Sequence, residues 1–322
     1  MKTPNLRHML TYRRPAGSAT EDAFIARYID TIPGIIVDEY GNRILICEGS
    51  KTMISCHTDT VHRVAGMQSI TSKKGIISLA KNERISNCLG ADDTAGIYAA
   101  LRMIQAGVKA TFIFHRDEEI GGKGSAWLAK NCSGWLSSFD RCIALDRRGI
   151  GDIITHQAFG RCCSDTFANS LALQLDMGHK RSDMGIFTDS ANYVGIIQEC
   201  TNVSVGYYNE HSVKETLDTV YLERLINQLI VADLDSLPTC EWVDDTVHWS
   251  YTRYSDTPID TGVEFSGDCE YCGDPHEELY VTDENMLVCG RCYRWFEMDR
   301  LDELEARLDG CSAHAESQGE LR

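Results

Sequence analysis

The chain has 322 residues with an apolar fraction of 43%, which fits one large globular domain with a small appendage better than two equal domains. Its 48 acidic residues outnumber 31 basic ones, giving a net charge of −17 that repels a phosphate backbone and argues against a nucleic-acid partner. The N-terminus lacks a signal-peptide pattern, and no segment approaches the roughly 20 apolar residues of a membrane span. We therefore expect a cytoplasmic protein without membrane attachment.

The first third of the chain predicts one helix and several strands. Ser18 to Glu21 has the pattern of a capping box, ahead of a helix that places Phe24, Ile25 and Ile29 on one face. The expected strands then cover residues 34–37, 43–47 and 51–56, followed by a hairpin over 67–80.

The remainder of the chain up to residue 237 alternates between strands and helices. Strands are expected at 110–114, 142–145, 196–199 and 202–205, and helices at 94–106, 124–131, 165–175 and 217–234. This alternation predicts an α/β fold, a mostly parallel mixed sheet with helices on both faces.

Side chains that bind metals recur near the ends of the predicted strands or in loops. They are His57-Thr58-Asp59, Asp92-Asp93, Glu118-Glu119, Asp146 and His211. Each has an ordinary alternative when taken alone: a hydrogen-bonded histidine, a helix N-cap, an exposed acidic loop, a surface salt bridge or a polar loop. Their order and their recurrence at strand ends predict one shared site, since ligands bind at the carboxyl ends of strands in open α/β sheets.

The charges of this set suit a pair of divalent cations. Two such ions carry +4, of which Asp92, Glu119 and Asp146 offset three units and a bound hydroxide the fourth. Asp92, between small residues, is the proposed bridge, because a shared carboxylate holds two metals at roughly 3.5–4 Å. Imidazole with carboxylate suits zinc, while manganese and cobalt stay open.

The order HxD, GADD, EE, D, H resembles that of the co-catalytic di-zinc exopeptidases and deacylases, which include peptidase T and bacterial leucyl aminopeptidases. The resemblance covers residues from about 5 to 235. Some relatives insert a lid domain between the fourth and fifth motifs, but only 64 residues separate Asp146 from His211 here. The lidless branch of the family is therefore the closer match.

The resemblance implies a role for each residue of the set. It implies two catalytic ions, one held by His57, Asp92 and Asp146, the other by Asp92, Glu119 and His211. Glu118 matches the general base and Asp59 the carboxylate that orients His57. The family also suggests a cis peptide bond at Asp92-Asp93. Thr188-Asp189-Ser190 resembles a short motif near the substrate in some relatives, although structural capping explains it equally well.

Two CxxC pairs near the C-terminus predict a zinc ribbon. Cys269, Cys272, Cys289 and Cys292 would close a tetrahedral shell around one structural zinc ion, with no open position for water. Residues 267–300 contain nine acidic and three basic residues, which argues against nucleic acid and favours docking to the catalytic domain or to a protein partner.

These expectations divide the chain into four parts. Residues 1–237 form the catalytic domain, 238–266 a linker or wrapping segment, 267–310 the ribbon with a short helix, and 311–322 a disordered tail. The expected function is that of a zinc-dependent hydrolase of amide bonds, an aminopeptidase acting on small peptides. A deacylase or carboxypeptidase with the same two-metal centre, acting on N-acyl small molecules, stays open. A non-catalytic binding or adaptor protein that retains the fold is the third alternative. The chain could also form a homo-oligomer or bind a protein partner through the ribbon.

Overall fold

The computed structural model describes residues 4–157 and 160–242, together with four short strands farther along the chain. The chain divides into two compact units, Met1–Thr246 and Val247–Arg322. In the second unit, β17 (Gly267–Asp268) pairs with β18 (Pro275–His276), and β19 (Leu279–Val281) pairs with β20 (Leu287–Cys289). The expected short helix and tail after residue 300, and most of the expected linker, lie outside the described residues.

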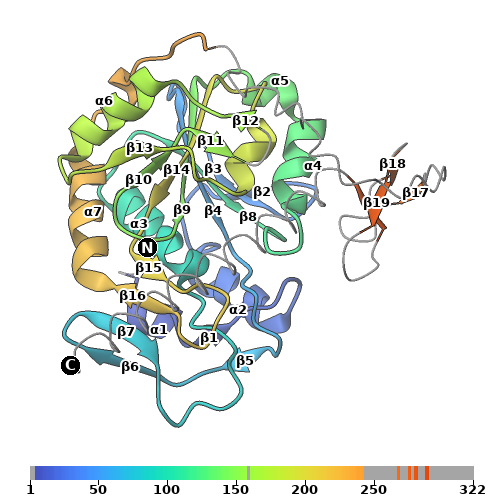
Figure 1. Cartoon of the computed structure of the whole chain (residues 1–322), viewed down its shortest axis with the longest axis vertical. Helices are drawn as coiled ribbons and strands as arrows, with labels where there is room; N and C mark the ends of the chain where they lie inside the picture. The colour runs from blue at the N-terminus through green and yellow to red at the C-terminus, as the bar shows by residue number, and fades with distance from the viewer. Residues whose placement is uncertain are drawn as a thin grey trace, which may run out of the picture. The chain divides into compact units, whose positions relative to one another are not determined.

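An eight-stranded mixed sheet forms the centre of the first unit (Figure 1). The central strands β14, β9, β4 and β8 are parallel, while β10, β3 and β2 join through antiparallel pairs. The strand order is β13 (Lys180–Ser182), β10 (Asp152–Ile154), β14 (Glu199–Ser204), β9 (Arg141–Arg147), β4 (Thr52–His57), β8 (Thr111–His115), β3 (Arg43–Leu45) and β2 (Ile36–Val37).

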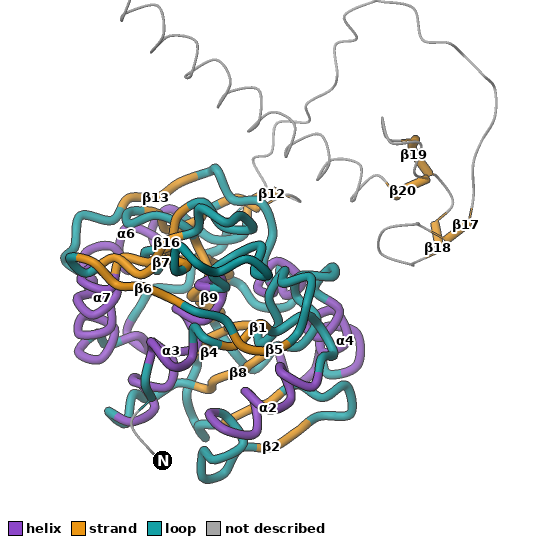
Figure 2. The backbone as a smooth tube through the Cα atoms, turned by 90° about the horizontal axis from the view of Figure 1, so that it is seen from below, coloured by secondary structure: helices purple, strands orange, loops and turns teal. Residues whose placement is uncertain are grey.

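Helices cover both faces of this sheet (Figure 2). The pleat of β4 separates the two cores, because Ile54 packs into one hydrophobic cluster and the adjacent Met53 into the other. One face carries α1 (Leu6–Met9), α2 (Ala19–Tyr28), α3 (Ala91–Gln105), α6 (Asp165–Leu175) and α7 (Thr219–Val231). The other carries α4 (Lys123–Asn131), α5 (Ser133–Leu136) and the 3-10 turn η1 (Asp189–Tyr193). The predicted α/β architecture is confirmed.

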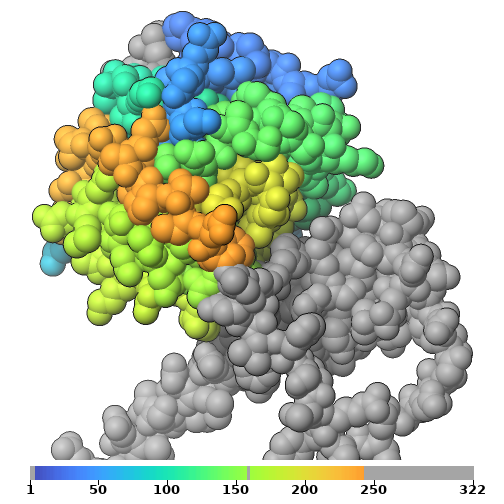
Figure 3. Space-filling view, turned by 90° about the horizontal axis from the view of Figure 1, so that it is seen from above, coloured from blue at the N-terminus to red at the C-terminus, as the bar shows by residue number. Residues whose placement is uncertain are grey.

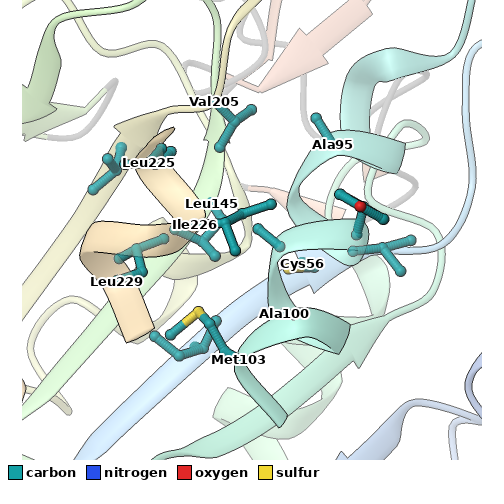
Figure 4. Close-up of a cluster of buried hydrophobic side chains, with 14 of the residues drawn as sticks. Cys56, Ala95, Ala100, Met103, Leu145, Val205, Leu225, Ile226 and Leu229 are labelled. Carbon is teal, nitrogen blue, oxygen red and sulfur yellow. The ribbon is translucent and has the colours of Figure 1, made fainter. Parts of the chain in front are cut away.

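Helix α3 lies against the centre of the sheet (Figure 4). Its small residues Ala95 and Ala100 share a buried cluster with Leu145 of β9 and with Ile226 and Leu229 of α7. At Gly96 an added Cβ would lie 2.0 Å from the Leu145 carbonyl oxygen, so only glycine permits this approach. The helix start, and with it Asp92, is therefore held close to the end of β9.

Small sheets surround the main one. The predicted hairpin is present as β6 (Ile70–Lys73) and β7 (Ile76–Leu79), and the turn residues Lys74 and Gly75 have positive φ. It pairs with β16 (Thr216–Asp218), which in turn pairs with β15 (Tyr207–Tyr208). This four-stranded sheet fixes both ends of the loop that carries His211. Two further pairs are β1 (Tyr12–Arg13) with β5 (Gly66–Met67), and β11 (His156–Gln157) with β12 (Gly160–Arg161).

Three local predictions differ from the structure. In place of the two strands expected at 196–199 and 202–205, there is one strand, β14, over Glu199–Ser204, because Cys200 and Thr201 are buried and paired with β9. The last helix starts at Thr219 rather than at residue 217, since Leu217 pairs with Ile77 in the small sheet. Ser18 caps α2 as expected, but the Glu21 carboxylate bonds to Gly17 and Thr58 instead of closing a capping box.

The segment of residues 234–242 covers the edge of the sheet at which the parallel strands begin. After the 3-10 turn η2 (Leu234–Ser236), the Leu237 carbonyl accepts a hydrogen bond from Arg141, and Trp242 donates one to the Gln198 carbonyl. Figure 3 shows the orange end of the described chain on this side of the molecule. The opposite edge, where the strands have their carboxyl ends, carries the predicted site residues. Among the described helices, none is long and apolar enough to span a membrane.

Candidate metal centre

The sequence-predicted residues converge at the carboxyl edge of three adjacent parallel strands. His57 is the last residue of β4, Asp146 lies near the end of β9, and Glu118 and Glu119 follow β8. Asp92 comes from the start of α3. Because neighbouring parallel strands end at the same edge, short connections are enough to bring these side chains together.

Two groups of side chains could each hold a metal ion, and they are called the first and second ligand groups. The first consists of His57, Asp92 and Asp146. The Nε2 atom of His57 lies 2.9 Å from Oδ1 of Asp92 and 3.5 Å from Oδ1 of Asp146. Only 1% of the His57 side chain and 7% of the Asp146 side chain are exposed. This group therefore lies largely inside the protein.

The second ligand group consists of Asp92, Glu119 and His211. The Nε2 atom of His211 lies 3.3 Å from Oδ2 of Asp92 and 3.2 Å from Oε2 of Glu119. Asp92 thus presents one carboxylate oxygen to each group, which is the arrangement of a bridging ligand. His211 reaches this position from a loop in which its φ is 60°.

The geometry of both groups suits bound cations. Donors bound to one zinc ion at about 2.0–2.2 Å in a tetrahedral shell lie roughly 3.4 Å apart. The separations of His57 from Asp146 and of His211 from Asp92 and Glu119 are close to this value, while His57 and Asp92 are nearer, at 2.9 Å. The Oε1 atom of Glu119 is buried and has no hydrogen-bond partner among the residues that the structure describes. Nitrogen and carboxylate oxygen donors suit zinc, manganese or cobalt.

The electrostatics also favour added positive charge. Burial, reinforced by Asp92, raises the pKa of Asp146 to about 7. Burial opposes a charge on His211, but the Glu119 and Asp92 carboxylates still raise its pKa to about 12. Both shifts indicate an excess of negative charge in a poorly hydrated place, which divalent cations would offset.

Glu118 and Asp59 lie beside the first ligand group. Oε2 of Glu118 is 3.9 Å from Nε2 of His57, and 11% of the Glu118 side chain is exposed. Burial raises the pKa of Glu118 well above its usual range, although His57 opposes that shift. Glu118 is not a member of either ligand group, which leaves its carboxylate free to reach a molecule bound there.

Asp59 contacts His57, as expected for a residue that orients it, and also contacts the backbone of Glu118 and Glu119. Nδ1 of His57 lies 3.2 Å from the Asp59 carbonyl oxygen and 3.5 Å from its carboxylate. The two carboxylate oxygens accept hydrogen bonds from the backbone N–H groups of Glu118 and Glu119, both at 3.1 Å. Asp59 therefore also fixes the backbone that carries both glutamates.

Three residues that hold Asp146 in place were not assigned this role from the sequence. Thr188 donates a hydrogen bond to Oδ2 of Asp146 at 2.7 Å, and Tyr207 donates one to Oδ1 at 3.1 Å. Asn202 brackets the Asp146 backbone through both its amide atoms. The motif at Thr188 was the only sequence signal for these contacts, and it holds a candidate ligand in place.

Beneath the HxD segment, a fully buried Arg14 was also missed. Its guanidinium donates hydrogen bonds to the Thr58 carbonyl and to Thr94, and it lies 4.0 Å from the centre of the Phe24 ring. The Asp93 carboxylate accepts a hydrogen bond from the backbone N–H of His57. An arginine in an N-terminal segment carries no pattern that would reveal these partners.

Glu215 is the most extensively hydrogen-bonded of the missed residues. Its carboxylate accepts hydrogen bonds from the backbone N–H groups of four consecutive residues, Leu89 to Asp92, at 2.7–3.1 Å. Only 1% of Glu215 is exposed. Its position four residues after His211 was the one signal available in the sequence.

The predicted cis peptide bond between Asp92 and Asp93 is confirmed. Both residues have non-helical backbone angles, so regular helix begins only after them. Their side chains consequently diverge: Asp92 faces the two ligand groups, while Asp93 accepts hydrogen bonds from His57 and Gly96.

Comparison with known proteins places this geometry on a known fold. No protein-family model matches the sequence, and no curated protein matches it either. Solved structures do match. The aminopeptidase PepT from Bacillus cereus has a TM-score of 0.56 at 15% identity, over 70% of this chain and 95% of that one.

Two further solved structures agree. A tripeptidase from Staphylococcus aureus matches with a TM-score of 0.57 at 15% identity, over 70% of this chain and 95% of its own. The TET1 peptidase of Pyrococcus horikoshii matches with a TM-score of 0.51 at 17% identity, over 70% and 98%. The chain has the fold of these peptidases. The fold expected from the resemblance is therefore confirmed.

The predicted zinc ribbon falls mainly outside the described residues. Cys289 lies in β20, and the other three predicted ligands, Cys269, Cys272 and Cys292, belong to segments that the structure does not describe. The ribbon stays a prediction from cysteine spacing.

Proposed function

We propose that this protein is a metal-dependent exopeptidase, an aminopeptidase acting on small peptides. The observation that carries the proposal is the position of Asp92, whose two carboxylate oxygens face two separate sets of histidine and carboxylate ligands. Glu118 lies beside them outside either set. The shared fold with proteins named aminopeptidases and a tripeptidase supports peptides as the substrate class.

In this proposal His57, Asp92 and Asp146 would hold the first ion, and Asp92, Glu119 and His211 the second. Two divalent cations bound there would lower the pKa of a water molecule and polarise the scissile carbonyl group. The Glu118 carboxylate accepts a proton from the attacking water and returns it to the leaving amine. Asp59 keeps Glu118 within reach by holding its backbone N–H.

The chain's own residues also limit access to the site. His57 and Asp146 are almost fully buried, whereas 48% of the His211 side chain is exposed. A peptide would therefore approach from the His211 side of the site.

Activity on unblocked aminoacyl chromogenic substrates tests the proposal directly. We expect turnover that is lost on chelation and restored by zinc. Turnover that ignores the chelator would overturn the mechanism. Peptides with blocked N-termini, blocked C-termini and N-acyl amino acids in the same assay separate an aminopeptidase from a carboxypeptidase or deacylase.

We further propose zinc as the metal, with two ions in the catalytic domain of residues 1–237 and one structural ion in the ribbon of residues 267–310. The proposed ribbon ligands are Cys269, Cys272, Cys289 and Cys292. Metal analysis of the purified chain should give about three zinc ions per molecule, because a closed four-cysteine site holds one. A value near one would favour an adaptor without catalysis.

A cytoplasmic location and self-assembly complete the proposal. The nine cysteines within residues 4–157 and 160–242 are all free thiols, which suits a reducing compartment. The Pyrococcus horikoshii peptidase of the same fold can assemble into a tetrahedron or a large octahedral shell, which supports a homo-oligomer here. Light scattering of the full chain would test this, with a monomeric mass as the contradicting result.

A further inference from the structure

Glu215 connects two of the three segments that supply the second ligand group, those of Asp92 and His211. We infer that Glu215 is a positioning residue, whose carboxylate fixes Asp92 relative to His211 so that Asp92 can bridge two cations. The inference rests on the proposed function, because it assigns Glu215 a role in that same centre. Its basis is the set of four hydrogen bonds from the N–H groups of residues 89–92.

On the Asp92 side, Glu215 does more than cap a helix. The N-cap of α3 is Gly90, which offers no side-chain acceptor, and Asp92 and Asp93 both have non-helical angles. The four N–H donors end at Asp92 itself, before the regular helix begins. The carboxylate therefore orders the short segment that carries the bridging ligand.

On the His211 side, Glu215 belongs to a loop with its own internal bonds. The backbone N–H of Glu215 bonds to the Ser212 carbonyl at 3.0 Å, and the Ser212 hydroxyl bonds to the Asn209 carbonyl at 2.8 Å. Directly after Glu215, β16 pairs with β7 and β15. His211 and Glu215 are consequently parts of one braced loop.

The two sides meet at the ligand atoms. Oδ2 of Asp92 lies 3.3 Å from Nε2 of His211, while Glu215 holds the backbone N–H of Asp92 at 3.1 Å. A shift of the loop would therefore move His211 and the Asp92 backbone together. Because Glu215 is buried, its charge depends on these four donors, each of which gives its hydrogen bond to the Glu215 carboxylate.

Replacement of Glu215 by glutamine keeps the size of the side chain and exchanges one acceptor oxygen for an NH2 group. In Glu215→Gln the amide oxygen can accept two N–H groups, but the amide NH2 faces the other two donors. Glu199→Gln is the matched control. Glu199 is also buried and accepts backbone N–H groups, from Ser164 and Cys240, but it begins β14 at the opposite edge of the sheet.

The test loads the full-length, metal-stripped protein with Mn²⁺, which prefers oxygen and nitrogen ligands over the thiolates of the predicted ribbon. Electron paramagnetic resonance distinguishes a spin-coupled Mn²⁺ pair from isolated ions. For Glu215→Gln we expect the coupled signal to be lost and the affinity for the second ion to fall about 10- to 100-fold. For Glu199→Gln we expect the coupled signal and both affinities to match those of the unaltered protein, even where thermal stability falls.

A coupled signal of normal intensity in folded Glu215→Gln would overturn the inference and leave the proposed function intact. Absence of a coupled pair in the unaltered protein would overturn the proposed function, and the inference with it. If Glu215→Gln does not fold, Glu215→Asp serves instead. It keeps the charge but is one methylene shorter, so we expect a weakened coupled signal, and a normal one would contradict us.

Discussion

The two ligand groups around Asp92 differ in what holds them. In the first group, His57 and Asp146 come from adjacent parallel strands and have exposed fractions of 1% and 7%. In the second, His211 comes from a loop and is 48% exposed. The sheet builds one half of the centre, whereas hydrogen bonds between loops build the other. Damage to the sheet should therefore cost stability and metal together, and damage to the loops should cost metal alone.

The largest expected effect is on turnover and follows from a change at Glu118, which lies beside the first ligand group and is a member of neither group. Glu118→Gln should lower kcat by about 10²- to 10⁴-fold, because the amide cannot accept the proton of the attacking water. Metal content should stay unchanged, since Glu118 is not a member of either ligand group. Steady-state kinetics with metal analysis checks this, with the exposed Glu39→Gln as the control. Full activity would remove Glu118 from the mechanism.

Removing one imidazole from each half compares them directly. His57→Ala and His211→Ala should each lose activity and about one bound ion. In the presence of chelator, His57→Ala should also lower the free energy of unfolding by about 2–4 kcal/mol, because it leaves buried carboxylates unpaired. His211→Ala should change it by less than about 1 kcal/mol, as expected for a half-exposed ion pair. Equal losses in denaturant titrations would remove the distinction.

Gly96→Ala probes the contact between α3 and the sheet. The added Cβ would meet the Leu145 carbonyl oxygen and the Asp93 carboxylate, so we expect a loss of about 1–3 kcal/mol in stability and weaker metal binding. Gly134→Ala in α5 is the control, because its Cβ would enter open space and replace a helical glycine. Denaturant unfolding and metal titration of both variants check this, and wild-type behaviour of Gly96→Ala would show that α3 can shift freely.

The last expected effect leaves the metal centre itself unchanged and concerns the pH dependence of stability near Gly90. Burial lowers the pKa of His62 to about 4, and its ring donates to or accepts from Thr60, Gln68 and the Cys88 carbonyl. The unfolded chain therefore binds this proton first, and stability should fall as pH drops from about 6.5 to about 4. His62→Gln should flatten this part of the stability profile by roughly 1–3 kcal/mol. An unchanged slope would contradict the assignment.

The sequence was sufficient to locate the sheet-built half of the site. Apolar runs predicted β4 and β9, and the residues at their ends, His57 and Asp146, lie at the predicted edge. Order and spacing then selected Asp92, Glu119 and His211. His57 and Asp146 lie where they were predicted, because strand ends have a fixed place in a parallel sheet. The metal-binding roles of all five residues stay predictions.

Hydrogen bonds from backbone N–H groups to side-chain carboxylates could not be predicted from strand ends, order or spacing. Glu215 and Asp59 accept hydrogen bonds from N–H groups of distant residues, and a backbone donor has no side-chain identity to recognise. The edge strand β13 and its neighbour β10 were also missed, because they contain only three residues each and include polar ones. The exposed Lys180 and Arg181 suit an edge strand but hide its pattern.

Asp92 as the bridge between two cations is the central claim. Crystals of the zinc-loaded protein, measured at the zinc absorption edge, would locate the ions by anomalous scattering. Two peaks should lie on either side of the Asp92 carboxylate, roughly 3.5–4 Å apart, one beside His57 and the other beside His211. A single peak, or none at Asp92, in metal-saturated crystals would contradict the account.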